Sequence, residues 1–252
     1  MKTLKAEDLE GFSTVLCDMD GVVWREGEIV WENVEGLRSL KGKGKKLIFI
    51  TNNSSKKPSD YESKLKGLGI EADGIITSST ATANYLIKRG IRRVYAVGEE
   101  GLIWALKSSE IEICDDGPEA VVVGIDRSFS YEKLKKASNF VYFGALFVAT
   151  NTDARIRDGK GILPGAGSIV KAISYASGKR PDAVIGKPNR YIFEGLDLNG
   201  VILIGDNLET DILGGKNLGI PTVLVLTGVH TLEDVERLSI EPDFFVEDLS
   251  QL

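Results

Sequence analysis

Short apolar segments recur along the chain, and most of them are continuously apolar instead of alternating with polar residues. They are rich in β-branched residues, and this pattern is typical of parallel strands that are covered on both faces. The segments are 13–18, 45–51, 93–98, 119–125, 146–151, 182–187, 200–206 and 222–228. Each of them predicts a strand.

The stretches between these segments have the spacing of amphipathic helices. In residues 59–69 the side chains of Tyr61, Leu65 and Leu68 fall on one face, and a glycine follows. Residues 168–178 begin at Ser168, which we expect to cap a helix that ends at Gly178. Strands that alternate with helices predict an α/β fold with a mostly parallel sheet.

Composition narrows the class of protein. A chain of 252 residues is long for a single core and suits two lobes. The net charge of -6 argues against nucleic acid or an anionic membrane as a partner. No apolar run reaches the ~18 residues of a membrane helix, and the charged N-terminus does not resemble a signal peptide. We therefore expect a cytoplasmic protein.

Cysteine and histidine are scarce. Cys17 and Cys114 lie far apart in the sequence, and His230 is the single histidine, so a zinc site of thiolates or imidazoles is not expected. A Ser-His-Asp triad would have to use His230, and the chain has no GxSxG motif.

Polar side chains stand where several of the predicted strands end. Ligands of open α/β sheets bind beyond the carboxyl ends of the strands, so these residues are candidates for one shared site. They are Asp18 with Asp20, Thr51 with Asn52 and Asn53, Asn151 with Asp153, Lys187, and Asp206.

Asp18 and Asp20 are the most informative pair. Because side chains alternate along a strand, both begin on the same side, and Gly21 permits a sharp departure of the chain. Two carboxylates this close favour a hard cation such as Mg2+, which prefers oxygen ligands. The alternative is a plain turn with a capping aspartate.

The segment Gly205 to Asp211 repeats this strand-end pattern. Asp206 leaves an apolar run, and Asp211 stands where a helix would start. A turn residue and a helix N-terminal charge are the alternative interpretation. With four aspartates in one site, the charges of Mg2+ and Lys187 are needed to make the arrangement tolerable, and one aspartate is favoured to carry a proton.

Two further segments carry donors. Thr51, Asn52 and Asn53 follow a strand and precede a helix, and hydroxyl, amide and main-chain N–H groups there suit a phosphate. Lys187 ends another strand. A simple turn and a solvated lysine are the alternatives.

Four motifs in this order, "DMDGVVW", "TNNSS", "VIGKPN" and "GDNLETDI", resemble those of the haloacid dehalogenase superfamily. The resemblance is closer still to its 4-nitrophenylphosphatase/NagD-like branch, and it covers nearly the whole chain. It implies a Rossmann-like doubly wound core, formed by residues 1–89 and 181–252, with an inserted α/β cap at 90–180. It also implies a Mg2+-dependent phosphatase.

The resemblance implies a role for each matching residue. Asp18 would form an aspartyl-phosphate, and Asp20 would protonate the leaving alcohol and then help to activate water. Thr51 and Asn52 would donate hydrogen bonds to the phosphoryl group, with Asn53 beside them, and Lys187 would neutralise it. Asp206, Asp18 and the main-chain carbonyl of Asp20 would bind Mg2+, supported by Asn207 and Asp211.

The cap would select a small phosphomonoester: a sugar phosphate, nucleotide monophosphate, phosphoglycolate or glycerol phosphate. Its candidate contacts are Asn151, Thr152, Asp153, Arg155 and Arg157. Asp153 would bond a sugar hydroxyl or hold its loop, and Trp24 is expected to pack or to line the mouth of the pocket. A homodimer through the cap is a further expectation. A phosphomutase, a receiver-like phospho-acceptor and a non-catalytic sugar- or nucleotide-binding module are the competing hypotheses.

Overall fold

The computed structural model describes residues 1–157 and 161–252, and the chain divides into two compact units. Unit 1 consists of Met1–Thr51, Ser59–Ile76 and Gly195–Leu252. Unit 2 consists of Asn52–Pro58 and Thr77–Glu194. The expected core and cap, with boundaries at 90 and 180, remain a prediction from the resemblance.

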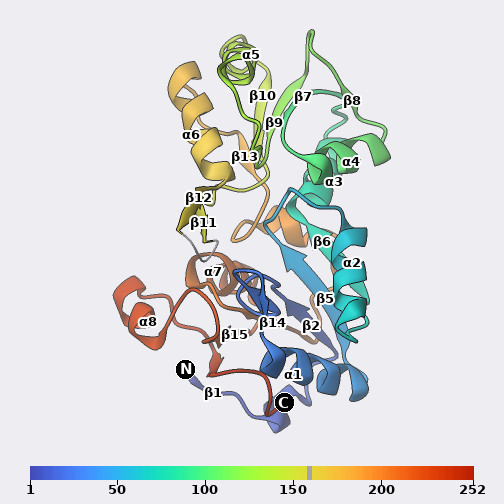
Figure 1. The fold of residues 1–252 in the computed structure, drawn as a ribbon, viewed down its shortest axis with the longest axis vertical. Helices are drawn as coiled ribbons and strands as arrows, with labels where there is room; N and C mark the ends of the chain where they lie inside the picture. The colour runs from blue at the N-terminus through green and yellow to red at the C-terminus, as the bar shows by residue number, and fades with distance from the viewer. Residues whose placement is uncertain (158–160) are drawn as a thin grey trace. The chain divides into compact units, whose positions relative to one another are not determined.

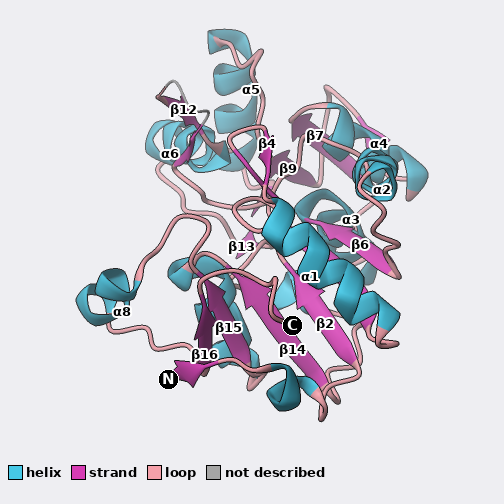
Figure 2. Ribbon diagram, turned by 60° about the horizontal axis from the view of Figure 1, so that its bottom comes forward, coloured by secondary structure: helices cyan, strands magenta, loops and turns pink. Residues whose placement is uncertain are grey.

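Unit 1 contains a seven-stranded sheet with the order β1-β16-β15-β14-β2-β5-β6. Its neighbouring strands are parallel wherever the register is given, and Figure 2 shows β16, β15, β14 and β2 side by side. The strands are β1 (Lys2–Thr3), β2 (Thr14–Cys17), β5 (Lys46–Thr51), β6 (Gly74–Thr77), β14 (Val201–Gly205), β15 (Thr222–Val225) and β16 (Phe244–Val246).

One face of this sheet packs against α1 (Trp31–Gly42) and α2 (Pro58–Gly67). The side chains alternate along each strand, so Val223 and Val225 join the core on this face. Leu224 points to the other face, where it packs with Leu208 and Val235. That second face carries the π-helical turn η3 (Leu208–Ile212), α7 (Leu213–Leu218) and α8 (Leu232–Leu238). Apolar layers on both faces explain the continuously apolar strands.

Two small elements flank β2 in unit 1. A 3-10 turn, η1 (Ala6–Leu9), precedes β2. A small antiparallel hairpin of β3 (Trp24–Arg25) and β4 (Glu28–Ile29) follows β2. Glu26 and Gly27 turn this hairpin with φ of 53° and 92°, the left-handed region that hairpin turns require.

Unit 2 has its own five-stranded parallel sheet, with the order β13-β10-β9-β7-β8. One face packs against α5 (Tyr131–Tyr142) and α6 (Ala166–Ser177). Figures 1 and 2 both show α3 (Ser78–Lys88) and α4 (Glu100–Ser108) on the opposite face. The strands are β7 (Arg93–Val97), β8 (Glu112–Ile113), β9 (Ala120–Val123), β10 (Leu146–Ala149) and β13 (Ala183–Val184).

Two smaller elements complete unit 2. An antiparallel hairpin is formed by β11 (Arg155–Arg157) and β12 (Ile162–Pro164). The 3-10 turn η2 (Arg190–Phe193) follows β13.

The α/β fold with mostly parallel strands is confirmed, and each apolar segment of the sequence contains a strand. The helix expected at 59–69 is confirmed as α2, with Tyr61 and Leu65 buried. The expectation that Ser168 caps the helix ending at Gly178, which is α6, is wrong. That helix begins at Ala166, and Ser168 lies inside it, where its hydroxyl donates to the carbonyl of Ala154 at 2.8 Å. Gly178 does end it, with φ of 71°.

Candidate active site

Asp18 and Asp206 follow two adjacent parallel strands. β2 lies beside β14 with Cys17 opposite Ile204, and the N–H of Asp18 donates to the carbonyl of Ile204 at 2.9 Å. The carboxyl ends of both strands therefore lie at one edge of the sheet. Asp18 is 7% exposed and Asp206 is 2% exposed, so the sheet holds two carboxylates out of bulk solvent.

Asp211 reaches the same place from the turn η3. Asn207 caps this turn, because its Oδ1 accepts the N–H groups of Glu209 at 2.9 Å and Thr210 at 3.3 Å. The main-chain N–H of Asn207 in turn donates to Oδ2 of Asp211 at 3.2 Å. This reciprocal arrangement fixes the carboxylate of Asp211, which is completely buried.

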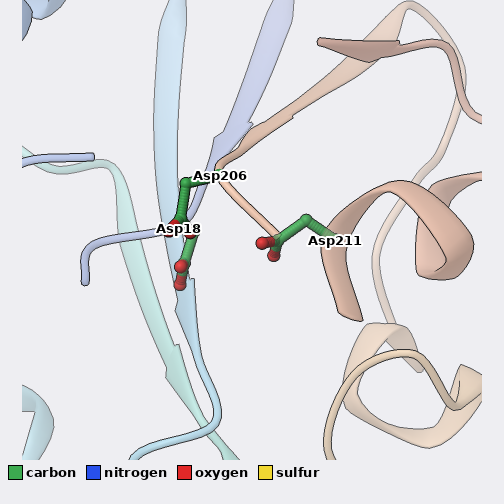
Figure 3. Close-up of side chains that lie close together, drawn as sticks. All are labelled: Asp18, Asp206 and Asp211. Carbon is green, nitrogen blue, oxygen red and sulfur yellow. The ribbon is translucent and has the colours of Figure 1, made fainter. Parts of the chain in front are cut away.

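Asp18, Asp206 and Asp211 form a cluster in which one carboxylate oxygen of each lies within 4.8 Å of the others. Figure 3 shows Asp18 and Asp206 close together, with Asp211 turned toward them from its helical turn. Three buried carboxylates at this distance repel one another unless a cation or a proton sits among them. Hard oxygen ligands are the set that Mg2+ prefers, so these residues fit that ion.

Glycines make room for the acids of this cluster. A Cβ on Gly21 would lie 2.1 Å from Oδ2 of Asp206, and one on Gly228 would lie 2.0 Å from the same atom. A Cβ on Gly205 would lie 2.3 Å from Asp211. Real side chains do not approach this closely, so any larger residue at these positions displaces an acid.

The loop after β15 orients Asp206. The N–H of Val229 donates to Oδ2 of Asp206 at 2.7 Å, and the N–H of His230 donates to its carbonyl at 3.2 Å. Nδ1 of His230 accepts the N–H of Leu208 at 3.1 Å. Burial lowers the pKa of His230, in keeping with an imidazole that accepts at Nδ1. The single histidine therefore joins the two loops beside the acids.

Asp20 does not join the three-acid cluster. Its side chain is exposed at the turn after β2, where Gly21 has φ of 85°. The N–H of Gly21 donates to the carbonyl of Trp24 at 2.7 Å, and the indole N–H of Trp24 donates to Oδ1 of Asp20 at 2.9 Å. Thr51, the last residue of β5, is buried and stands two residues beyond Phe49, which pairs with Cys17 of β2.

The remaining candidates belong to unit 2, where Asn52 is the centre of a hydrogen-bond network. Its Oδ1 accepts the N–H of Lys187 at 2.7 Å, and its Nδ2 donates to the carbonyl of Lys187 at 3.1 Å. Nδ2 also donates to Oδ2 of Asp153 at 3.1 Å. Lys187 is buried, with 4% of its surface exposed. Asn52 thus fixes the segments that carry Lys187 and Asp153.

Two other predicted contacts, Asn53 and Arg155, also lie in unit 2. Oδ1 of Asn53 accepts the N–H of Ser55 at 2.9 Å and its hydroxyl at 2.7 Å, which makes a turn. Arg155 lies exposed in β11. The side chain of Arg157 lies outside the part of the chain that is described.

The sequence predicted a strand before Asp18, Thr51, Asn151, Lys187 and Asp206, and it treated the ends of these strands as candidates for one shared site. The strands before Asp18, Thr51 and Asp206 belong to the sheet of unit 1, whereas β10 and β13 belong to the sheet of unit 2. Val229 was not predicted, because a main-chain donor has no signature in its side chain. Trp24 was predicted only as a packing or pocket residue.

Comparison with known proteins gives two family matches. Residues 15–112 match the model described as haloacid dehalogenase-like hydrolase. Residues 184–252 match a second model, described as HAD-hydrolase-like. The two matches include Asp18, Asp20, Lys187, Asp206 and Asp211.

Curated relatives are similar along their whole length. The acid sugar phosphatase of Staphylococcus saprophyticus is 35% identical over 254 residues, which cover 97% of this chain and 98% of the relative. The 5'-nucleotidase YutF of Bacillus subtilis is 36% identical over 91% of this chain and 94% of its own.

A solved structure, the 4-nitrophenylphosphatase of Thermotoga maritima, superposes with a TM-score of 0.90 at 35% identity. It covers 96% of this chain and 97% of its own. NagD from Escherichia coli K-12 superposes with a TM-score of 0.87 at 32% identity, over 96% and 98% of the two chains.

Proposed function

Because the chain belongs to the haloacid dehalogenase-like hydrolases, in the NagD-like branch, and is a phosphatase, we propose that it hydrolyses phosphomonoesters through an aspartyl-phosphate on Asp18. The observation that carries this proposal is the cluster of Asp18, Asp206 and Asp211 at the carboxyl ends of β2 and β14. A buried nucleophile among acids needs a cation, and a cation at this point would also meet the phosphoryl oxygens.

The first half of the reaction forms the covalent intermediate. A carboxylate oxygen of Asp18 attacks phosphorus, and the bond between phosphorus and the ester oxygen breaks. Asp20, in its protonated form, gives its proton to that oxygen, so the alcohol leaves neutral. The exposed position of Asp20 at the turn leaves its carboxyl group accessible to a substrate.

The second half returns the enzyme to its starting state. Asp20, now ionised, takes a proton from water while the water oxygen attacks phosphorus. The bond between phosphorus and Asp18 breaks, and inorganic phosphate leaves. Asp20 ends protonated and Asp18 ends ionised, so both are ready for the next ester.

We infer that Asp18, Asp206 and the main-chain carbonyl of Asp20 hold Mg2+, with Asp211 and Asn207 in support. Bound there, Mg2+ supplies positive charge that offsets the acids and the phosphoryl oxygens. The hydrogen bond from Val229 to Asp206 and the cap on η3 at Asn207 orient the acids that would bind it.

The other roles are carried over from the family motifs. In our proposal Thr51 and Asn52 donate to the phosphoryl group, Asn53 lies beside them, and Lys187 supplies positive charge. The hydrogen bonds between Asn52 and both main-chain groups of Lys187 support a shared role, because they fix one residue by the other.

The substrate we propose is a small phosphorylated metabolite, a sugar phosphate or a nucleotide monophosphate first among them. Relatives named acid sugar phosphatase and 5'-nucleotidase support these two classes. Phosphoglycolate and glycerol phosphate are the others. Selection by the inserted segment 90–180, with Asp153 and Arg155, is part of this proposal, as is a cytoplasmic location. Among the helices described, none has the length and apolar character to cross a membrane.

A homodimer through the inserted segment is also proposed. Exposed aromatic side chains of unit 2 support it, with Tyr131 of α5 77% exposed, Phe143 81% exposed and Tyr175 of α6 93% exposed. Light scattering on the purified protein would give a mass of two chains, and a mass of one chain would contradict the dimer.

The decisive experiment for the reaction is Asp18→Asn. It should abolish hydrolysis of 4-nitrophenyl phosphate while the protein keeps its fold, because an amide oxygen is a poor nucleophile. Asp116→Asn is the matched control, since Asp116 is exposed in a loop of unit 2 and should leave turnover unchanged. Undiminished turnover in Asp18→Asn would remove the nucleophile assignment. Transfer of phosphate to an added sugar, faster than to water, would favour a phosphomutase instead.

A further inference from the structure

Asp20 and Trp24 are joined across the turn that follows β2. The indole Nε1–H of Trp24 donates to Oδ1 of Asp20 at 2.9 Å. The main chain reinforces this link, because the carbonyl of Trp24 accepts the N–H of Gly21 at 2.7 Å. The proposed general acid, Asp20, is therefore hydrogen-bonded to Trp24, a residue to which the proposed reaction assigns no role.

The indole has little freedom to move. Trp24 is only 5% exposed, although Asp20 beside it is exposed. Its ring stacks on Tyr61 of α2, with 6.3 Å between ring centroids and 8° between the planes. The ammonium of Lys64, one turn further along α2, lies 3.6 Å from the centroid of the indole. Packing and a cation–π contact thus hold the donor in one orientation.

An exposed carboxyl group on a turn samples several rotamers, and each wrong rotamer moves the proton away from the ester oxygen. A fixed donor at Oδ1 removes part of that freedom. Misplacement of a catalytic group by about 1 Å can cost on the order of 10²-fold in rate.

We propose that Trp24 is the positioning residue of the general acid, and that it holds the carboxyl group of Asp20 through its indole N–H. This inference rests on the proposed function, in which Asp20 protonates the leaving alcohol. Tyr61 and Lys64 act through Trp24, because they fix the plane of its ring.

If Trp24 positions the general acid, its loss should affect esters with poor leaving groups selectively, which a purely structural role of Trp24 would not explain. Protonation matters most when the leaving group is a poor one. An alkyl ester such as glycerol 2-phosphate depends on the acid, whereas 4-nitrophenolate leaves readily without a proton. Loss of the indole N–H should therefore reduce kcat/KM, which reports departure of the alcohol and not hydrolysis of the shared intermediate, far more for the alkyl ester than for the nitrophenyl ester.

The experiment compares Trp24→Phe with wild type on these two substrates. Phenylalanine keeps an aromatic ring against Tyr61 and Lys64 but has no N–H. We expect kcat/KM for glycerol 2-phosphate to fall on the order of tenfold more than kcat/KM for 4-nitrophenyl phosphate. Trp31→Phe is the matched control, because Trp31 is 53% exposed at the start of α1. Trp31→Phe should leave the ratio of the kcat/KM values for the two substrates unchanged.

Asp20→Asn separates this inference from the proposed function. If Asp20 is the acid, this variant loses more kcat/KM on the alkyl ester than on the nitrophenyl ester, by about 10²-fold or more. An equal loss of kcat/KM on both esters would refute the acid role and the positioning role together. A differential loss in Asp20→Asn with an unchanged ratio in Trp24→Phe would overturn the positioning role alone.

A second variant guards against a folding defect. Replacement of Trp24 by 3-benzothienylalanine keeps the bicyclic ring and puts sulfur in place of the N–H. Should Trp24→Phe unfold, this protein must show the same selective loss on glycerol 2-phosphate. A wild-type ratio in it would contradict the proposal.

Discussion

Oδ2 of Asp206 accepts a hydrogen bond of 2.7 Å from the main-chain N–H of Val229. The donor belongs to the loop after β15, and the acceptor to the end of the neighbouring strand β14. A main-chain donor cannot rotate away as a side chain can. The orientation of this acid is therefore set by the path of a loop, and changes in that loop should reach the site.

Gly228→Ala tests this directly. The added Cβ would lie 2.0 Å from Oδ2 of Asp206, so the carboxylate or the loop must move. We expect turnover of 4-nitrophenyl phosphate to fall on the order of 10²-fold, because small displacements of such groups are costly. Gly42→Ala is the control, since a Cβ there meets no atom within 4 Å. Wild-type turnover in Gly228→Ala would show that Asp206 need not stay in place.

Metal removal should affect activity and stability together. Chelation should abolish turnover, and Mg2+ should restore it. At a concentration of about 100 Kd, Mg2+ should also add about 2.7 kcal/mol to the free energy of unfolding, measured by urea denaturation. Activity that persists in a chelator, after carried-over metal has been removed, would contradict the metal assignment.

The Asp206→Asn variant should be at least as stable as wild type without metal and less stable than wild type with Mg2+. Without metal it relieves repulsion among three carboxylates within 4.8 Å, so we expect its melting temperature to equal or exceed that of wild type. With Mg2+ the wild type should be the more stable protein, because the variant has lost a ligand. A lower melting temperature for Asp206→Asn in chelator would argue against repulsion in the cluster.

Tyr61→Phe should not destabilise unit 1. The Tyr61 hydroxyl is buried, and among the described residues it finds no hydrogen-bond partner. Burial, with Asp20 and Asp18 nearby, raises the pKa of this phenol, which therefore stays protonated. Because an unsatisfied buried hydroxyl costs about 1–3 kcal/mol, its removal should leave the free energy of unfolding unchanged or raise it. A loss of more than about 1 kcal/mol would reveal a hidden partner.

Asp234 should make the free energy of unfolding fall as the pH is lowered below about 4. Its carboxylate accepts the N–H of Thr231 at 2.9 Å at the start of α8, and this bond with that to Arg237 lowers its pKa from 3.8 to about 2. A depressed pKa means that the folded state favours the ionised form. The stabilisation is complete above pH 3.8 and is lost as the pH falls through about 2.

Asp234→Asn should therefore lower the melting temperature above pH 4, and the gap to wild type should narrow from pH 4 toward pH 2. Melting curves of both proteins across this range give the measurement. A gap that stays constant with pH would mean that the charge of Asp234 contributes nothing.

Much of the fold could be predicted because its strands are buried on both faces. Continuous apolar runs such as 200–206 give a strong signal, and the runs in both units share it. Because β10 and β14 are both continuously apolar, the apolar pattern alone does not tell which sheet each strand joins. The division at residues 90 and 180 came from the resemblance to the family. The edge strand β1 was not predicted, since two exposed residues, Lys2 and Thr3, carry no pattern.

The sequence predicted the parts of the candidate site that follow from strands, and it missed the parts that depend on turns. Asp18 and Asp206 stand at the ends of strong strands, so their meeting follows from the parallel sheet. The place of Asp211 depends on the π-helical turn η3, whose five residues have no periodic pattern to read. The bond from Trp24 to Asp20 depends on a turn that brings residues four apart together, and alternation along a strand does not foresee it.

The position of β2 between β14 and β5 has a consequence for how the protein is made. Residues Ser13 and Gly200, at the start of β2 and just before β14, bond to each other although 187 residues separate them in the chain. The strands of the five-stranded sheet, β7, β8, β9, β10 and β13, are all synthesised in between. On a ribosome this sheet can complete its pairing first, while β2 waits for the last fifth of the polypeptide with one long side unpaired. Slow closure of such distant partners exposes a strand edge to other chains.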